Sequence, residues 1–156
     1  MRKLLITSAL SVFTLTSFAA TQGTLLLQGT ISQVLSLSVQ AEAGVNNALD
    51  LTNTESDLKV AEVTEQTNSN TGYKILVKTA NAGKLKNGSL GQVSYTMKYD
   101  GSAVALASTD TQAKSVATGG VYNNTSDVEI SYTGQSAASL TQGTYSDTVT
   151  FTIQAN

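Results

Sequence analysis

The stretch "GTLLLQGTISQVLSLSV", residues 23–39, decides how the rest of the sequence is interpreted. Apolar residues recur at every second position, which is the period of a β-strand with one buried face. A single strand of this length would extend on the order of 50 Å, whereas strands of globular domains usually have about five or six residues. Part of the stretch is therefore surplus to one strand. The alternating apolar positions are Leu25, Leu27, Ile31, Leu35, Leu37 and Val39.

Two arrangements accommodate the surplus. Residues 24–39 could bend and serve both sheets of a sandwich. Alternatively, only residues 33–40 form the first strand of the domain, and residues 21–31 form a free arm. Such an arm needs a groove, because burying each of its three large apolar side chains contributes about 1.5 to 3 kcal/mol and pairing with an open sheet edge adds to that. The pattern alone leaves both arrangements open.

The first 19 residues have the features of a secretory signal peptide. Arg2 and Lys3 supply a positive start, residues 4–16 are mostly apolar or small, and Ser17-Phe18-Ala19 fits a cleavage site. No later window approaches the roughly 20 apolar residues of a spanning helix. We therefore expect an exported protein without a membrane span.

The length and composition of the mature chain exclude several classes of function. Cleavage after Ala19 would leave 137 residues, enough for one domain. These contain seven lysines, no arginine and 11 acidic residues, a net charge of −4, so no basic surface for nucleic acid is expected. The absence of histidine and cysteine excludes the usual zinc sites, His-based triads and disulfides. We expect neither a metal nor an organic cofactor.

Acidic residues are the remaining candidates for chemistry, and they occur as three close pairs. Exposed strand faces or loops explain such pairs better than catalytic dyads do, because acidic side chains are ordinarily exposed. Calcium binding by the first pair is weakly supported, since the dense ligand pattern and central glycine of a calcium loop are missing. The sequence therefore does not predict an enzyme. The pairs are Glu55 and Asp57, Glu62 and Glu65, and Asp127 and Glu129.

Short alternating runs separated by Asn, Gly and Asp clusters predict an all-β protein, a sandwich or barrel of about eight strands without helices. Asp100-Gly101 is the signal for a two-residue type I′ hairpin. Proline often protects edge strands from pairing with another chain, and this chain has none. Residues 80–89 and 108–120 are expected to be loops, and the expected strands are 48–52, 57–66, 73–79, 92–99, 102–107, 121–124, 127–133 and the run ending at 153.

The order of these patterns resembles chaperone–usher fimbrial subunits over nearly the whole mature chain. The resemblance rests on the alternating N-terminal segment, "YKILVK", "VSYTMKYDGSAVAL" and the ending "GTYSDTVTFTI". It is closest to the cysteine-free alpha class of colonisation-factor major pilins, and the ending also resembles spore-coat-U-like archaic pilins. The resemblance implies an immunoglobulin-like β-sandwich that lacks its last strand, which the N-terminal extension of the next subunit supplies.

The resemblance also implies a role for each segment. Residues 20–32 would be the donor-strand extension and residues 33–156 the pilin domain, with a single domain fitting a shaft subunit better than a two-domain adhesin. Implied partners are identical or related pilins, a periplasmic chaperone and an outer-membrane usher, in an adhesive fimbrium at the cell surface. The donor residues would be Leu25, Leu27, Gly29 and Ile31, and the acceptor groove would be lined by Val34, Leu35, Leu37, Val39, Val149, Phe151 and Ile153.

A self-contained secreted sandwich that binds a glycan or protein is the alternative. Its contacts would be tyrosines, although tyrosine is also common on half-buried sheet faces. An enzyme is the least supported class, because no nucleophile has a recognisable base. The candidate contact residues are Tyr95, Tyr99, Tyr122 and Tyr132.

Overall fold

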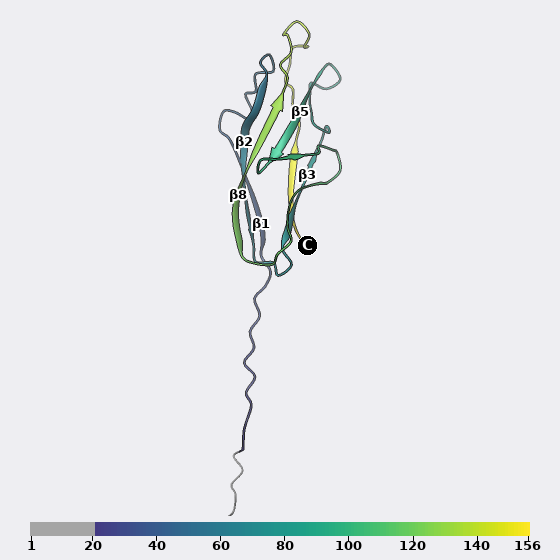
Figure 1. Ribbon diagram of the computed structural model, residues 1–156. Helices are drawn as coiled ribbons and strands as arrows, with labels where there is room; N and C mark the ends of the chain where they lie inside the picture. The colour runs from purple at the N-terminus through teal and green to yellow at the C-terminus, as the bar shows by residue number, and fades with distance from the viewer. Residues whose placement is uncertain (1–20) are drawn as a thin grey trace, which may run out of the picture. The chain divides into compact units, whose positions relative to one another are not determined.

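The computed structural model describes residues 21–156, so the expected signal peptide at 1–19 lies outside the described residues. Every regular element in them is a β-strand, which confirms the all-β prediction (Figure 1). The strands are β1 (Leu35–Ala41), β2 (Glu55–Thr67), β3 (Tyr73–Thr79), β4 (Lys84–Lys86), β5 (Gln92–Tyr99), β6 (Ser102–Val104), β7 (Thr111–Val116), β8 (Tyr122–Tyr132) and β9 (Val149–Ala155).

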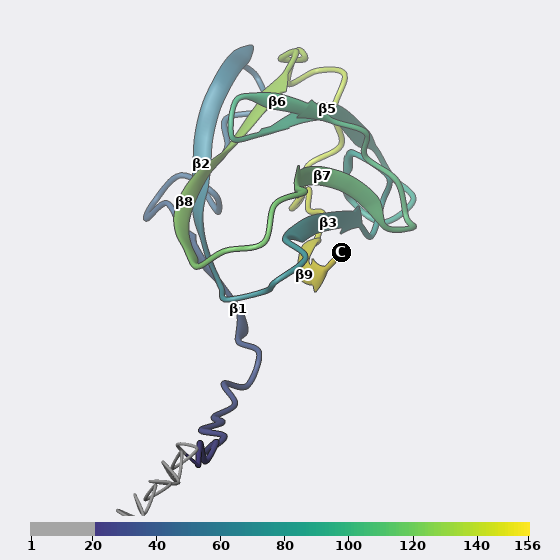
Figure 2. The same ribbon diagram turned by 60° about the horizontal axis from the view of Figure 1, so that its bottom comes forward.

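The strands form two antiparallel sheets. The larger has the order β1-β2-β8-β5-β4, with β6 also paired to β5, and the smaller has the order β7-β3-β9. Figure 2 shows β7, β3 and β9 as a layer apart from β2 and β8. Apolar side chains fill the space between the layers, as in a β-sandwich. The chain divides into two units, residues up to Ile31 and Ser32–Asn156, and the sandwich belongs to the second.

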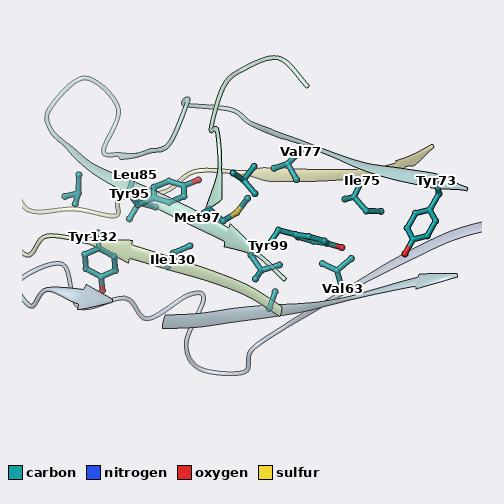
Figure 3. Close-up of a cluster of buried hydrophobic side chains, with 14 residues drawn as sticks. Val63, Tyr73, Ile75, Val77, Leu85, Tyr95, Met97, Tyr99, Ile130 and Tyr132 are labelled. Atoms are coloured by element: carbon teal, nitrogen blue, oxygen red, sulfur yellow. The ribbon is translucent and has the colours of Figure 1, made fainter. Parts of the chain in front are cut away.

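Buried and more exposed residues alternate strictly along β3 and β5, and the buried ones form much of the core. Along β3 and β5 every odd-numbered residue from Tyr73 to Val77 and from Val93 to Tyr99 is buried. Side chains of successive strand residues point to opposite faces, so this parity turns both sets toward the interior. Figure 3 shows these side chains together with Val63 and Ile130 of the larger sheet. The expected strands 73–79 and 92–99 are confirmed at both ends.

The turn between β5 and β6 is also confirmed. Asp100 and Gly101 have positive φ angles of 52° and 72°, as the two central residues of a type I′ turn require. Tyr99 pairs with Ser102 directly across this turn.

The expected loop at 108–120 is wrong, because it contains strand β7. The register of β7 against β3 shifts between Ile75 and Leu76, so that Ala113 is an extra residue. A bulge of this kind breaks the period of two that identifies a strand in a sequence. Strand β7 also turns Lys114 inward, where the sequence pattern predicts an apolar residue.

Three smaller expectations also differ. Residues 121–124 and 127–133 were separate strands in the sequence interpretation, but β8 is continuous because its polar centre includes the buried Ser126. Residues 48–52 form no strand, and Leu51 and Thr52 lie in a turn in which the Asp50 carboxylate accepts hydrogen bonds from the Thr52 backbone and hydroxyl. The expected loop at 80–89 contains the short strand β4.

Ile75 provides a test of this packing. It is fully buried at the centre of β3, so Ile75→Ala is expected to lower the free energy of unfolding by about 2 to 5 kcal/mol through lost burial and the cavity left behind. Urea unfolding followed by circular dichroism measures the loss. Lys78→Ala, at an exposed position of the same strand, is the matched control. Equal losses in the two variants would contradict the assigned core.

Candidate functional site: two open sheet edges

Two open sheet edges lie on the same side of the sandwich. Strand β1 ends the larger sheet and pairs with β2, and β9 ends the smaller sheet and pairs with β3. Figures 1 and 2 both place β1 and β9 side by side, and within residues 21–156 no ladder joins them. Soluble proteins normally protect such edges, because the unpaired backbone groups can bind another strand.

The hydrogen bonds at the ends of β9 show which backbone groups are open. The Ala80 N–H donates to the Thr148 carbonyl (2.9 Å), and the Asn156 N–H donates to the Gly72 carbonyl (3.4 Å). In an antiparallel pair, hydrogen-bonded and non-hydrogen-bonded pairs alternate. Even-numbered residues of β9 therefore bond to β3. The odd-numbered residues from Val149 to Ala155 direct their N–H and C=O groups to the open edge.

Strand β1 has the same arrangement. The Glu42 N–H donates to the Val60 carbonyl (2.8 Å), and the Asn68 N–H donates to the Val34 carbonyl (3.4 Å). The even-numbered residues thus bond to β2, and the odd-numbered residues have open backbone groups. These odd-numbered residues are Leu35, Leu37, Val39 and Ala41.

The same residues carry the apolar side chains of both edges. On β9, Val149, Phe151 and Ile153 are half-buried and pack against the core. On β1, Leu37 is half-buried, whereas Leu35 and Val39 are 38% and 48% exposed. The interior face of the sandwich is therefore incompletely covered along this side.

A cavity of about 220 Å³ lies between the two edges. Val39 and Ala41 line it from β1, and Val149 and Phe151 line it from β9. Its other lining residues include Leu85, Met97 and Ile130 of the core. We call this cavity and the two flanking edges the groove.

Six of the seven residues expected in an acceptor groove share this inward parity, and Val34 does not. Val34 precedes β1 and has the opposite parity from Leu35. Its backbone is bound by Asn68, whose Oδ1 accepts from the Val34 N–H at 2.6 Å. The structure therefore gives Val34 an anchoring contact at the start of β1.

Residues 21–31 contain no helix or strand. Leu25, Leu27 and Ile31 are 83%, 84% and 91% exposed. At Gly29 an added Cβ would meet no atom within 4 Å. These apolar side chains are exposed, so burial within their own segment does not explain its alternating pattern.

The sequence analysis missed a buried polar cluster centred on Glu65. Its carboxylate is fully buried and accepts hydrogen bonds from the hydroxyls of Tyr73, Tyr99 and Ser126. It also forms an ion pair with Lys114, with 3.2 Å between Nζ and Oε2. The expectation that Glu65 is exposed is wrong. Glu65 lies two residues after Val63, so both side chains are on the apolar face of β2, and this spacing in the sequence could have predicted its burial.

The cluster changes the protonation of its members. Burial, followed by the hydrogen bond to Glu65, raises the pKa of the Tyr99 hydroxyl, and the same two causes raise the pKa of Tyr73. Burial acts to lower the pKa of Lys114, but the hydrogen bond to Asp100 and the charge of Glu65 outweigh it, so the pKa is raised. Lys114 therefore stays charged and Tyr99 neutral at ordinary pH.

The other acidic pairs form surface contacts. Asp57 pairs with Lys98 (2.7 Å), and Asp127 pairs with Lys59 (2.9 Å). Exposed ion pairs of this kind contribute little to stability. Residues 21–156 bring no three acidic side chains together as a metal site would require. In the same residues, no helix has the length and hydrophobicity to cross a membrane.

The tyrosines considered as ligand contacts are mostly core residues. Tyr95, Tyr99 and Tyr132 are buried, so the interpretation of these three as exposed contacts is wrong. Tyr122 is half-buried and packs against Tyr73 with ring centroids 5.4 Å apart. The structure gives the alternative binding module no aromatic surface from this set.

Comparison with known proteins found similarity to solved structures but not to any known sequence family. No protein-family model and no curated protein matches the sequence. A chain from a solved structure of a chaperone–usher pilus, described for the basis of rod uncoiling, is similar to this chain with 14% identity and a TM-score of 0.47. The match covers 90% of this chain and 99% of that chain. Similarity at this level carries no argument about function, so the proposal below rests on the residues.

The raised tyrosine pKa values predict alkaline sensitivity. The pKa of these tyrosines is higher in the folded chain than in the unfolded chain, where it is about 10. Their protonated hydroxyls therefore stabilise the folded state. This stabilisation is complete below the unfolded-state pKa and is lost as the pH rises through the folded-state pKa. We expect the urea midpoint to fall above about pH 10. Tyr99→Phe should make this fall shallower at an unchanged lysine content. A midpoint with the same pH dependence in both proteins would contradict the role assigned to Tyr99.

Proposed function

We propose that this protein is a structural subunit of an extracellular pilus that polymerises by donor-strand exchange. In this proposal the arm, residues 21–31, of one copy inserts into the groove of the next copy. The observation that carries it is a match of two patterns. The groove presents open backbone groups and apolar side chains at the same odd-numbered positions, and the arm presents apolar side chains with the same period and no cover.

The arm is long enough for the edge. Eleven residues extend about 36 Å at 3.3 Å per residue, whereas the seven residues of β9 extend about 23 Å. A donor strand could therefore pair along all of β9 by β-augmentation. Its backbone groups would satisfy the open N–H and C=O groups of Val149, Phe151 and Ile153.

The side chains of the arm match the groove in chemistry. Leu25, Leu27 and Ile31 would point inward together and cover the half-exposed face between β1 and β9. Burying each of them contributes about 1.5 to 3 kcal/mol. Gly29, on the same face, would lie where the groove is shallow. Leu26 has the opposite parity and would remain on the outer surface.

A second copy is a better donor than the chain's own arm. Insertion of its own arm beside β1 would require a tight reversal between Ile31 and Leu35, where the sequence is Ser32-Gln33-Val34. Ser32 is common in turns in general, but none of the three is the Gly, Asn or Asp that a tight hairpin turn prefers. The Val34 N–H and C=O are also bound by Asn68, which keeps this point of the chain extended.

The same groove explains how the subunit would be handled before assembly. A subunit with an open β9 edge is prone to aggregation, so a periplasmic chaperone would bind this edge after export and an outer-membrane usher would exchange the chaperone for the next arm. The product is a fimbrium at the cell surface that supports adhesion. The lack of cysteine fits a shaft subunit of the alpha class.

Peptide binding tests the proposed exchange. A chain that lacks residues 21–31 should be stabilised by a synthetic peptide of residues 21–33, because the peptide supplies the missing strand. Phe151→Asp should abolish the rise in melting temperature by placing a charge in the groove. Thr152→Asp, exposed on the same strand, should retain it. An arm-deleted chain that is fully stable and unaffected by peptide would refute donor-strand exchange.

Gly29→Leu tests the donor side. An added Cβ at Gly29 meets no atom within 4 Å, so the subunit should fold normally. As a donor it should overpack the shallow part of the groove, at a cost of about 1 to 3 kcal/mol per junction. We expect fewer and shorter polymers on non-boiled gels at an unchanged level of monomer. Gly23→Leu, near the start of the arm, is the matched control. Equal polymer lengths in both variants would contradict the assigned register.

A further inference from the structure

We propose that Glu65 is a positioning residue for the groove, and that it acts through Tyr99 on Phe151. This inference rests on the proposed function. It concerns how the acceptor is kept ready for a donor strand when its last strand is missing.

The Glu65 cluster joins the two sheets. Glu65, Tyr99 and Ser126 belong to the larger sheet, whereas Tyr73 and Lys114 belong to the smaller. Figure 3 shows the Tyr73 ring extending from β3 across the interior. All these groups bind one carboxylate. The cluster therefore fixes how far apart the sheets lie at this end of the core.

The cluster also reaches both walls of the groove. On one side, Leu37 of β1 is directly opposite Glu65 of β2, in a non-hydrogen-bonded pair, where side chains lie closest together. On the other side, the Tyr99 ring packs against Phe151 of β9, with centroids 5.8 Å apart. The hydroxyl of the same ring is held by Glu65. Tyr99 thus connects the carboxylate to the open edge.

A buried charge suits this role better than an apolar contact does. An apolar groove without its strand can close by moving its walls together, since apolar packing has no preferred direction. The Glu65 carboxylate cannot move toward β9 without breaking hydrogen bonds that replace its lost hydration, and a buried polar group left unpaired is costly. In residues 21–156, every buried side-chain nitrogen and oxygen has a partner. The fully satisfied cluster therefore resists closure of the groove.

Two matched variants separate positioning from stability. Tyr99→Phe and Tyr73→Phe each remove one hydrogen bond to Glu65 and keep an aromatic ring, and three donors to Glu65 remain in each case, so both should fold. Tyr73→Phe also removes the hydrogen bond that the Asn124 side chain donates to the Tyr73 hydroxyl. Only Tyr99 packs against Phe151. The readouts are the melting temperature and the affinity of the full-length monomeric protein for a fluorescently labelled peptide of residues 21–33. The chemical shifts of the Phe151 ring protons report its position directly.

We expect both variants to lower the melting temperature, and Tyr73→Phe to lower it at least as much as Tyr99→Phe because Asn124 also loses its acceptor. Tyr99→Phe should weaken peptide binding about fivefold, the effect of losing roughly one hydrogen bond, and shift the Phe151 resonances. Tyr73→Phe should do neither. If the wild type binds the peptide but both variants bind it with equal affinity to each other, the inference is wrong and the proposed function stands. If the wild type does not bind the peptide, both fail.

Discussion

The alternation of an antiparallel sheet is the constraint on which the rest of this structure depends. In β1 and β9 the residues whose backbone groups face the open edge are also those whose side chains face the interior. Hydrogen bonding and burial are therefore incomplete at the same positions. A single inserted strand with apolar residues at every second position would complete both at once. The chain carries such a segment in residues 21–31.

The Glu65 cluster is a second constraint, and it compensates for what the composition lacks. Some β-sandwiches join their two sheets with a disulfide, but this chain has no cysteine. Here the ion pair with Lys114 and the hydrogen bond from Tyr73 connect the sheets instead, and hydrogen bonds from Tyr99 and Ser126, in the same sheet as Glu65, complete the cluster. Because such a network needs every partner in place, it specifies one arrangement of the layers. An apolar core of the same volume would tolerate several.

Local sequence patterns were sufficient to predict the strands in which apolar and polar residues alternate strictly. The bounds of β3 and β5, the type I′ turn and the all-β class all follow from periodicity and turn residues. Strand β7 was missed because its bulge shifts the alternation, and β8 was divided because Ser126 interrupts its apolar pattern. Glu65 was misplaced for a related reason. The partners that make its burial tolerable come from four other strands, and no local pattern records them.

The absence of proline affects how the two open edges can pair with other strands. Proline on an edge strand removes a backbone donor and so blocks pairing with another chain. In β1, β9 and residues 21–31 every residue retains its N–H. Each of these segments can therefore take part in a continuous ladder. A sequence selected to stay monomeric would be expected to interrupt at least one of them. Under the proposed function, these edges are the surfaces through which copies of the chain assemble.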